Sequence, residues 1–163
     1  MPVIVLLLLH DDGGSDRAHL WAAGLFAIGA GSDFLDGYLA RKHALTTRLG
    51  EWLDPFSDKL LVIAPMVVLV YQGEFPWWAA AIIIGREIAV SLLRVWLGAR
   101  NLSLPAAMTG KVKAVLQMAA ITLYILPGIP DAARVATLAV ALVFTVWSGA
   151  EYFMGLRQRL EAN

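Results

Sequence analysis

Residues 132–150 read AARVATLAVALVFTVWSGA, a stretch in which Arg134 is the one charged side chain. A helix rises about 1.5 Å per residue, so roughly 20 residues cross a hydrocarbon core about 30 Å thick. The stretch shows no alternation of apolar and polar residues, which a barrel strand would require. It therefore predicts a membrane-spanning helix.

The rest of the chain has the same character. Its 163 residues are 59% hydrophobic and 16% charged, with a mean hydropathy of +0.67, an apolar excess that a soluble domain of this size does not have. Helices are predicted at 1–9, 19–40, 50–72, 77–99, 108–126 and 132–156. We expect one transmembrane catalytic domain over 1–163, an all-α polytopic membrane helix bundle of six helices. The first is truncated, because nine residues extend only about 14 Å.

Charge distribution predicts the orientation. The formal net charge is zero, so no general attraction to nucleic acid is expected, and the absence of cysteine excludes disulfides and thiol chemistry. Basic residues gather in two connections, 41–49 and 100–113, and in the tail: Arg41, Lys42, Arg48, Arg100, Lys111, Lys113, Arg157 and Arg159. These segments are expected on the cytoplasmic side.

Four aspartates mark the candidate site. Residues 32–59 read SDFLDGYLARKHALTTRLGEWLDPFSDK, so Asp33 and Asp36 are three residues apart, and Asp54 and Asp58 four apart. Each pair then projects from one face of its helix. Carboxylates in a membrane protein are costly unless they have partners. Two facing pairs would form an oxygen-rich cage suited to hard divalent cations such as Mg²⁺ or Mn²⁺.

Small and basic residues lie between the two pairs. Gly37 and Ala40 remove bulk beside the carboxylates, and Gly50 does the same at the start of the next helix, so that a base or a phosphate can approach. Arg41 offers a fork that suits phosphate oxygens. Alternatively, the small residues serve only to pack helices together, and Arg41 only anchors the helix at the cytoplasmic side.

A second polar group lies in the fourth and fifth predicted helices. Arg86, Glu87 and Arg94 interrupt one span, and Lys111 and Lys113 open the next. Arg86 would lie roughly 14 Å deep, where an arginine needs partners. Four cations converging near a metal cage suit an acceptor that bears a phosphate. Alternatively, Lys111 and Lys113 are ordinary cytoplasmic charges that flank a membrane span and do not bind an acceptor.

The aspartate region resembles a known family. Asp33-x2-Asp36-Gly37-x2-Ala40-Arg41-x8-Gly50-x3-Asp54-x3-Asp58 is similar to the signature of the CDP-alcohol phosphatidyltransferases. The resemblance implies that Asp33, Asp36 and Asp54 bind two metal ions and that Asp58 lies beside the second ion as the general base. It also implies a CDP-lipid site formed by Gly37, Ala40, Arg41, Thr47 and Gly50.

The second polar group narrows the resemblance to one branch. Residues 85–94, GREIAVSLLR, and 110–118, GKVKAVLQM, resemble the bacterial phosphatidylglycerophosphate synthases. This implies transfer of a phosphatidyl group from CDP-diacylglycerol to sn-glycerol 3-phosphate, with Arg86, Arg94, Lys111 and Lys113 on the acceptor's phosphate and Glu87 orienting them. It also implies a homodimer among the lipids of the bacterial inner membrane, with its active site facing the cytoplasm.

Other functions stay open at this point. The same chemistry could use inositol phosphate as acceptor, or phosphatidylglycerol in a cardiolipin synthase. A divalent-cation transporter is the alternative of another class, although it leaves Gly37, Ala40 and Arg41 unexplained.

Two further expectations concern the ends of the chain. Family members normally begin with an interfacial helix before the first span, and here Met1-Pro2-Val3 stands where that span is already under way. We therefore expect the chain as written to be impaired or inactive, and extension of the reading frame upstream to restore activity. Near the other end, Glu151 is expected either to pair with a cation of the acceptor pocket or to reach the interface.

Overall fold

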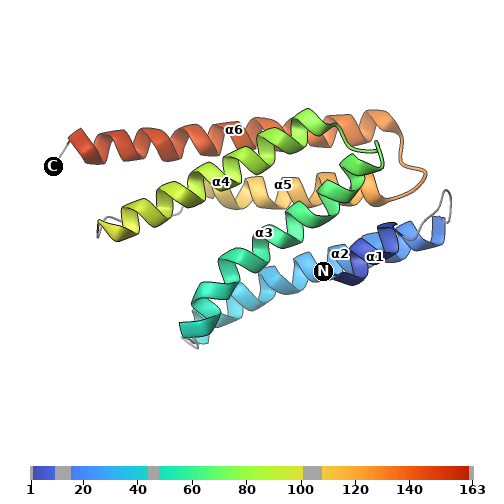
Figure 1. The fold of residues 1–163 in the computed structure, drawn as a ribbon, viewed down its shortest axis with the longest axis horizontal. Coiled ribbons are helices and arrows are strands. Elements are labelled where there is room, and N and C mark those ends of the chain that lie inside the picture. The colour runs from blue at the N-terminus through green and yellow to red at the C-terminus, as the bar shows by residue number, and fades with distance from the viewer. Residues whose placement is uncertain (1, 10–15, 44–47, 101–107, 162–163) are drawn as a thin grey trace.

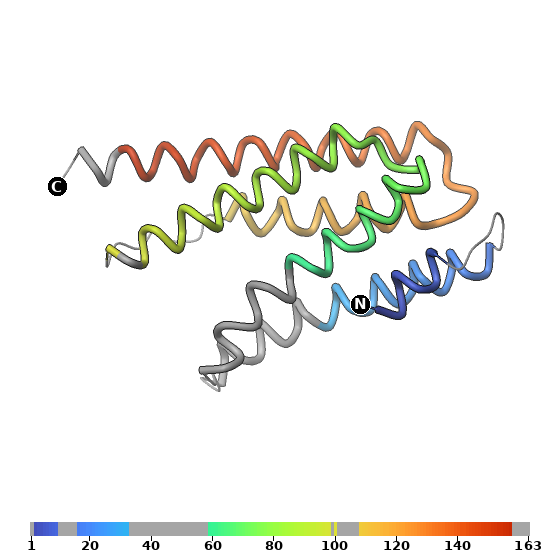
Figure 2. The backbone as a smooth tube through the Cα atoms, in the orientation of Figure 1, coloured from blue at the N-terminus to red at the C-terminus, as the bar shows by residue number. Residues whose placement is uncertain are grey.

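The computed structural model describes the backbone of residues 2–9, 16–43, 48–100 and 108–161, and the side chains in these ranges except those of 33–43, 48–58, 99 and 158–161. Figure 2 marks in grey the residues that are not fully described.

All regular structure in the described ranges is helical. The helices are α1 (Pro2–Leu9), α2 (Asp16–His43), α3 (Arg48–Tyr71), α4 (Trp77–Ala99), α5 (Met108–Ile125) and α6 (Asp131–Glu161). The predicted all-α fold with six helices is confirmed, and α2 and α6 extend further than the sequence suggested. Figure 1 shows the α3–α4 and α5–α6 connections at one end of the molecule, and the last turns of α4 and α6 at the other.

Composition identifies fewer spans than helix length does. Among the described residues, one segment, Asp131–Arg157 in α6, is both long and apolar enough to cross a membrane, and Lys59–Tyr71 in α3 is a shorter apolar helix. At 23 residues, α4 has the length of a span. Arg86, Glu87 and Arg94 lie within it, however, and lower its mean hydropathy.

The helices pack in a defined order. In the described part of the chain α5 packs against α6, α2 and α3, while α4 packs against α6 and α3. A buried apolar cluster at the end with the α3–α4 turn joins these helices; there the rings of Phe75 and Tyr124 lie 4.7 Å apart at 60°. The turn forms where predicted, because Gly73 adopts a φ of 77°, which L side chains rarely take.

The same end contains an arginine with a structural role. Arg134 in the first turn of α6 donates hydrogen bonds to the carbonyl oxygens of Leu123 (3.2 Å) and Leu126 (2.7 Å). It lies 4.0 Å from Asp131 and over the ring of Tyr124. The last carbonyls of a helix have no partner within the helix, so Arg134 satisfies the end of α5 and joins it to α6.

Candidate active site

The backbone places the four aspartates on two helices. Asp33 and Asp36 lie in the last turns of α2, and Asp54 and Asp58 in the first turns of α3. The predicted helical spacing of each pair therefore holds for the backbone. Their side chains lie outside the described residues, as do those of the proposed CDP-lipid residues Gly37, Ala40, Arg41 and Gly50; Thr47 lies outside the described backbone as well.

The donor set of this pair of helices suits a hard cation. All four candidate ligands are carboxylates, which are the oxygen donors that Mg²⁺ and Mn²⁺ prefer. Among the residues with described side chains, no group of three or more histidines or acidic residues could hold a metal ion. The metal site predicted at the four aspartates stays a prediction, since their side chains lie outside this part of the chain.

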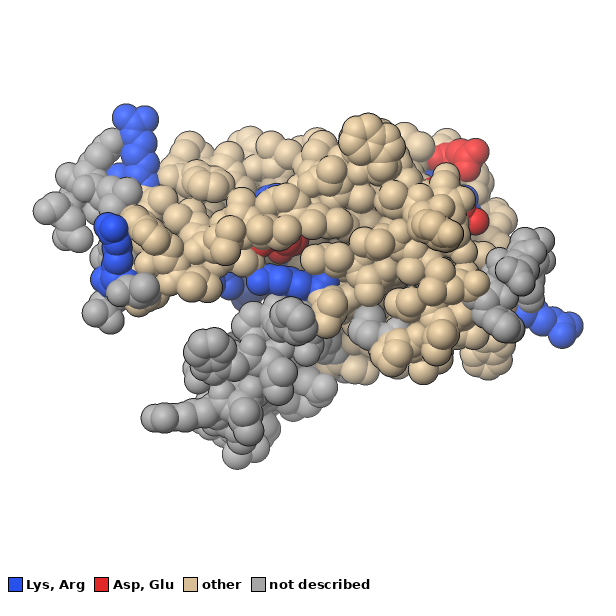
Figure 3. Space-filling model, in the orientation of Figure 1, with Lys and Arg blue, Asp and Glu red and all other residues tan. Residues whose placement is uncertain are grey.

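The centre of the described site is Glu87 on α4. Its Oε1 accepts hydrogen bonds from Nη1 of Arg86, at 3.2 Å, and from Nζ of Lys113 on α5. The three side chains are largely buried, with 15% of Arg86, 15% of Glu87 and 7% of Lys113 exposed. On the face shown in Figure 3, charged atoms of both signs gather in the middle, and the remaining charged atoms lie toward the two ends. Desolvated charges are tolerated only when paired in this way.

The charges of the described part of the site do not balance. Among the residues with described side chains, Arg86 and Lys113 share the carboxylate of Glu87, so this group of three carries one excess positive charge. Arg94 lies close enough to add to the positive potential at Lys113. An excess of positive charge in a largely buried site favours an anion.

The structure separates the two lysines of α5. Lys113 is buried and paired with Glu87, whereas Lys111 is exposed. Residues two apart on a helix point in different directions, so the ion-pair network of the described residues includes Lys113 but not Lys111.

Helix α6 contributes polar residues that sequence reasoning did not single out. Ser148 Oγ accepts a hydrogen bond from Nη2 of Arg86 at 3.0 Å, and Gln117 on α5 donates to Thr145 Oγ1 at 2.9 Å. Ser148, Gln117 and Thr145 are 3%, 2% and 0% exposed. A signal was present, because Thr145 and Ser148 are three apart within an apolar span and therefore share a face.

Glu151 has two hydrogen-bond partners that the sequence did not predict. Its two carboxylate oxygens accept hydrogen bonds from Thr109 Oγ1 at 2.5 Å and from the indole of Trp147 at 2.8 Å. The expected alternatives were a pocket cation and the interface. The contact with Thr109 joins the start of α5 to α6, and the contact with Trp147 lies within α6.

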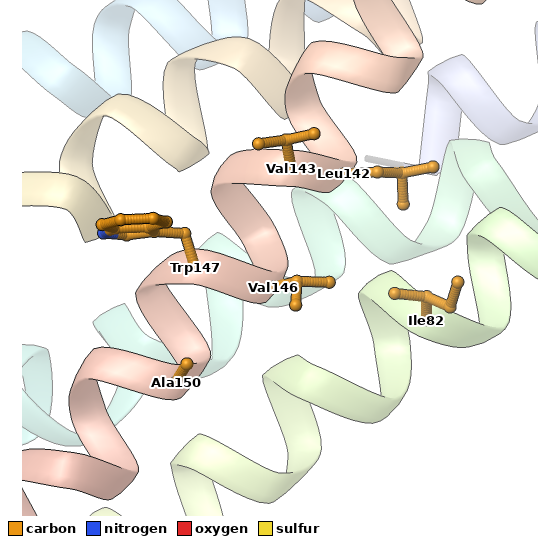
Figure 4. A pocket seen from close by; sticks show the side chains of 6 residues that line it. All are labelled: Ile82, Leu142, Val143, Val146, Trp147 and Ala150. Carbon is orange, nitrogen blue, oxygen red and sulfur yellow. The ribbon is translucent and has the colours of Figure 1, made fainter.

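An apolar groove runs between α4 and α6 on another side of α6. Figure 4 shows its lining, which is Ile82, Leu142, Val143, Val146, Trp147 and Ala150. None of the charged residues discussed above lines this groove. The polar site and the apolar groove thus occupy different faces of the same helix.

Known proteins resemble this chain over most of its length. Residues 1–147 match the CDP-alcohol phosphatidyltransferase family. A protein of Bacillus subtilis named CDP-diacylglycerol–glycerol-3-phosphate 3-phosphatidyltransferase is 43% identical over 141 residues, covering 83% of this chain and 73% of that protein.

Two further relatives agree with this match. The Escherichia coli K12 protein of the same name is 42% identical over 147 residues, covering 85% of this chain and 80% of its own. A probable phosphatidylglycerophosphate synthase of Mycobacterium tuberculosis H37Rv is 35% identical over 154 residues, covering 93% of this chain and 73% of that protein. The chain forms a helical bundle with paired aspartates on α2 and α3, and it matches the family model and these relatives over most of its length. It therefore belongs to the CDP-alcohol phosphatidyltransferases.

Proposed function

We propose that this chain transfers the phosphatidyl group of CDP-diacylglycerol to sn-glycerol 3-phosphate, giving phosphatidylglycerol phosphate and CMP. The observation that carries the proposal is the largely buried group of Arg86, Glu87 and Lys113, in which two cations share one carboxylate. An acceptor with its own phosphate supplies the missing negative charge. Serine has no phosphate and would leave that charge unmatched.

The names of the relatives support the same acceptor. The proteins from Bacillus subtilis and Escherichia coli are named as transferases to glycerol 3-phosphate. Both relatives match the segments that contain this group, because the matches cover more than four fifths of the chain.

Each described residue of the site has a distinct task in this proposal. Arg86 and Lys113 bind the phosphate of the acceptor through charge-assisted hydrogen bonds. Glu87 holds these two cations in place before the acceptor arrives, so less ordering is needed on binding. Arg94 adds positive potential near Lys113, and exposed Lys111 attracts the anion from solution.

The transfer itself needs a base and a leaving group. The acceptor hydroxyl oxygen forms a bond to the phosphorus that carries the diacylglycerol, and the bond from that phosphorus to the bridging oxygen of CMP breaks. We assign the hydroxyl proton to Asp58, which acts as the general base. Gly37, Ala40, Arg41, Thr47 and Gly50 are proposed to bind the CDP group.

Two divalent cations complete the proposed site. Asp33, Asp36, Asp54 and Asp58 would hold two Mg²⁺ or Mn²⁺ ions, which would neutralise charge on the diphosphate and lower the pKa of a bound hydroxyl. The oxygen-only donor set and its helical spacing support this assignment.

The setting of the enzyme is also proposed. We place the single domain, residues 1–163, in a bacterial cytoplasmic membrane with the active site facing the cytoplasm, because the predicted basic connections follow α2 and α4. By the family resemblance it works as a homodimer. Light scattering of the protein in detergent tests the dimer, and labelling of single cysteines introduced at positions 45 and 128 in intact cells tests the orientation.

A direct assay tests the reaction. Purified protein in detergent receives CDP-diacylglycerol, Mn²⁺ and one candidate acceptor at a time, and CMP release is measured. We expect turnover with glycerol 3-phosphate, and loss of turnover when the cation is chelated. Turnover with inositol phosphate or phosphatidylglycerol, but not with glycerol 3-phosphate, would overturn the choice of acceptor.

A variant tests the assignment of the base. Asp58→Asn should lower turnover by at least about 100-fold, because general-base catalysis typically contributes that much or more. The measured uptake of Mn²⁺ distinguishes loss of the base from loss of the metal site. Unchanged turnover in this variant contradicts the role of Asp58.

A further inference from the structure

Arg86 reaches across the bundle from α4 to α6. Its Nη2 donates a hydrogen bond of 3.0 Å to Ser148 Oγ, although the two residues are 62 positions apart in sequence. Glu87, by contrast, is the direct neighbour of Arg86 in the chain. Ser148 is therefore the contact that fixes Arg86 relative to another helix.

The hydroxyl of Ser148 donates one hydrogen bond and accepts another. It donates to the carbonyl oxygen of Thr145 at 3.2 Å, so its lone pairs are left to accept from Arg86. Thr145 is held in turn, since its hydroxyl donates to the carbonyl oxygen of Ala141 at 2.6 Å and accepts from Gln117. A buried chain of hydrogen bonds therefore extends from α5 through α6 to Arg86, and such chains restrict the rotamers of their members.

Gly149 contacts the same arginine at a second point. A Cβ placed on Gly149 would lie 3.4 Å from Cγ of Arg86 and 3.8 Å from its Nε. The stem of Arg86 thus lies against the bare backbone of α6. A larger side chain at 149 would occupy the space that the stem now fills.

These two contacts leave one donor of the guanidinium without a partner among the described residues. Nε of Arg86 is buried and has no hydrogen-bond partner among the described residues. An N–H without a partner in such a place is costly unless a ligand or water satisfies it. The contacts to Ser148 and Gly149 hold the stem and one terminal nitrogen of Arg86, while its Nε–H has no partner among the described residues.

We propose that Ser148 and Gly149 of α6 are positioning residues for the acceptor site, which act by holding Arg86 in the conformation that binds the phosphate of the acceptor. The inference rests on the proposed function, because it takes Arg86 as a phosphate ligand. It extends the acceptor site to a third helix. The sequence motifs of α4 and α5 do not include these residues.

Removal of the Ser148 hydroxyl tests the first contact. In Ser148→Ala we expect the KM for glycerol 3-phosphate to rise about 10-fold, the effect of losing one hydrogen bond to a charged group. The kcat and the KM for CDP-diacylglycerol should stay within about twofold. Ser148→Thr keeps the hydroxyl and should restore most of the affinity.

A hydroxyl elsewhere on α6 provides the matched control. Among the described residues, Thr137 bonds only to the carbonyl oxygens of its own helix, those of Ala133 and Arg134. Thr137→Ala should leave both KM values unchanged. A rise in the KM for glycerol 3-phosphate in this control would show that any loss of a hydroxyl on α6 has the same effect, and would overturn the inference.

Added bulk tests the second contact. Gly149→Val should raise the KM for glycerol 3-phosphate about 10-fold, because overpacking displaces the stem of Arg86. Gly24→Val is the matched control, since Gly24 lies in α2 and a Cβ added there would have no described atom within 4 Å. It should leave the KM unchanged.

Thermal unfolding in detergent separates these outcomes without turnover. Glycerol 3-phosphate should raise the Tm of the unmodified protein and of Thr137→Ala, and raise it much less for Ser148→Ala. If the unmodified protein releases CMP with glycerol 3-phosphate but Ser148→Ala keeps its KM, the inference fails and the proposed function stands. If the unmodified protein neither turns over nor responds to this acceptor, both are overturned.

Discussion

Two arginines lie at different levels of the described bundle, Arg134 beside the α5–α6 connection and Arg86 about midway along α4, and their partners differ in kind. Arg134 donates to two neutral carbonyl oxygens at the end of α5 and lies near Asp131. Arg86 shares the carboxylate of Glu87 with Lys113 and donates to a hydroxyl. The contacts of Arg134 complete a helix end, whereas those of Arg86 leave a positive charge and a buried Nε–H unmatched among the described residues.

The comparison separates a structural arginine, Arg134, from Arg86, the arginine that we propose binds the acceptor. Depth in the bundle does not separate them, because both are partly buried. The two arginines differ instead in how far the described residues balance their charge and satisfy their hydrogen-bond donors. A group whose charge is not balanced by the protein indicates that a ligand supplies the rest.

The largest effect is expected at Arg86. Arg86→Ala should lower kcat/KM for glycerol 3-phosphate about 100-fold, since a charged hydrogen-bonding group contributes about 1.5–3 kcal/mol. Arg86→Lys keeps the charge but loses the fork, and should fall between Ala and the unmodified protein. Steady-state CMP release measures both. Equal activity of Arg86→Ala and the unmodified protein would remove the distinction between the two arginines.

The lysines of α5 give a sharper form of the same test. Lys113→Ala should lower kcat/KM for glycerol 3-phosphate by about 10-fold or more, because it removes a buried cation with a partner. Lys111→Ala should change it by no more than about threefold, since exposed charges are screened by water and salt. The same CMP assay compares the two. The reverse order of effects would show that the exposed lysine, and not the buried one, binds the acceptor.

Arg134 should affect stability and not kinetics. Arg134→Ala removes two hydrogen bonds at the end of α5 and should lower the free energy of unfolding by about 1–3 kcal/mol, while both KM values stay unchanged. Titration with a denaturing detergent, followed by circular dichroism, measures the loss. Arg17→Ala, an exposed arginine on α2, serves as the control and should be neutral. A changed KM in Arg134→Ala would contradict the division of roles.

The smallest effect is expected at the contact between Thr109 and Glu151. Thr109→Val removes one hydrogen bond from a carboxylate that keeps its bond to Trp147. Because Glu151 lies near solvent, water can replace the lost donor. We expect kcat/KM, measured by the same CMP release, to change by less than about twofold. A larger loss would place this contact within the acceptor site.

Much of the fold was predictable from the sequence, for local reasons. Apolar runs and the Gly and Pro residues between them determine where α3 ends and α4 begins, because Gly73 takes a conformation that other residues avoid. The depth of Arg86 in its span also predicted that it needs partners. Glu87, its neighbour in the chain, was one of them.

The remaining contacts of the site depend on how the helices rotate against each other. Ser148 and Gly149 meet Arg86 because α6 packs on α4 in one particular register, and a single sequence does not contain that information. Lys111 and Lys113 looked equivalent as flanking charges, yet the orientation of α5 buries one of them. The prediction for the aspartates stays a prediction, since their side chains lie outside the described residues.

A single oxygen atom joins two helices at this site. Within the described ranges α4 does not pack against α5, yet Oε1 of Glu87 on α4 meets Nζ of Lys113 on α5. The side chains of Glu87 and Lys113 together span the distance between α4 and α5. The side chain at position 87 must therefore be long enough as well as negatively charged. Aspartate is shorter by one methylene, about 1.5 Å, and would keep the charge without bridging the gap. Glutamine keeps the length and loses the charge. Glu87→Asp therefore tests the need for length, and Glu87→Gln tests the need for charge.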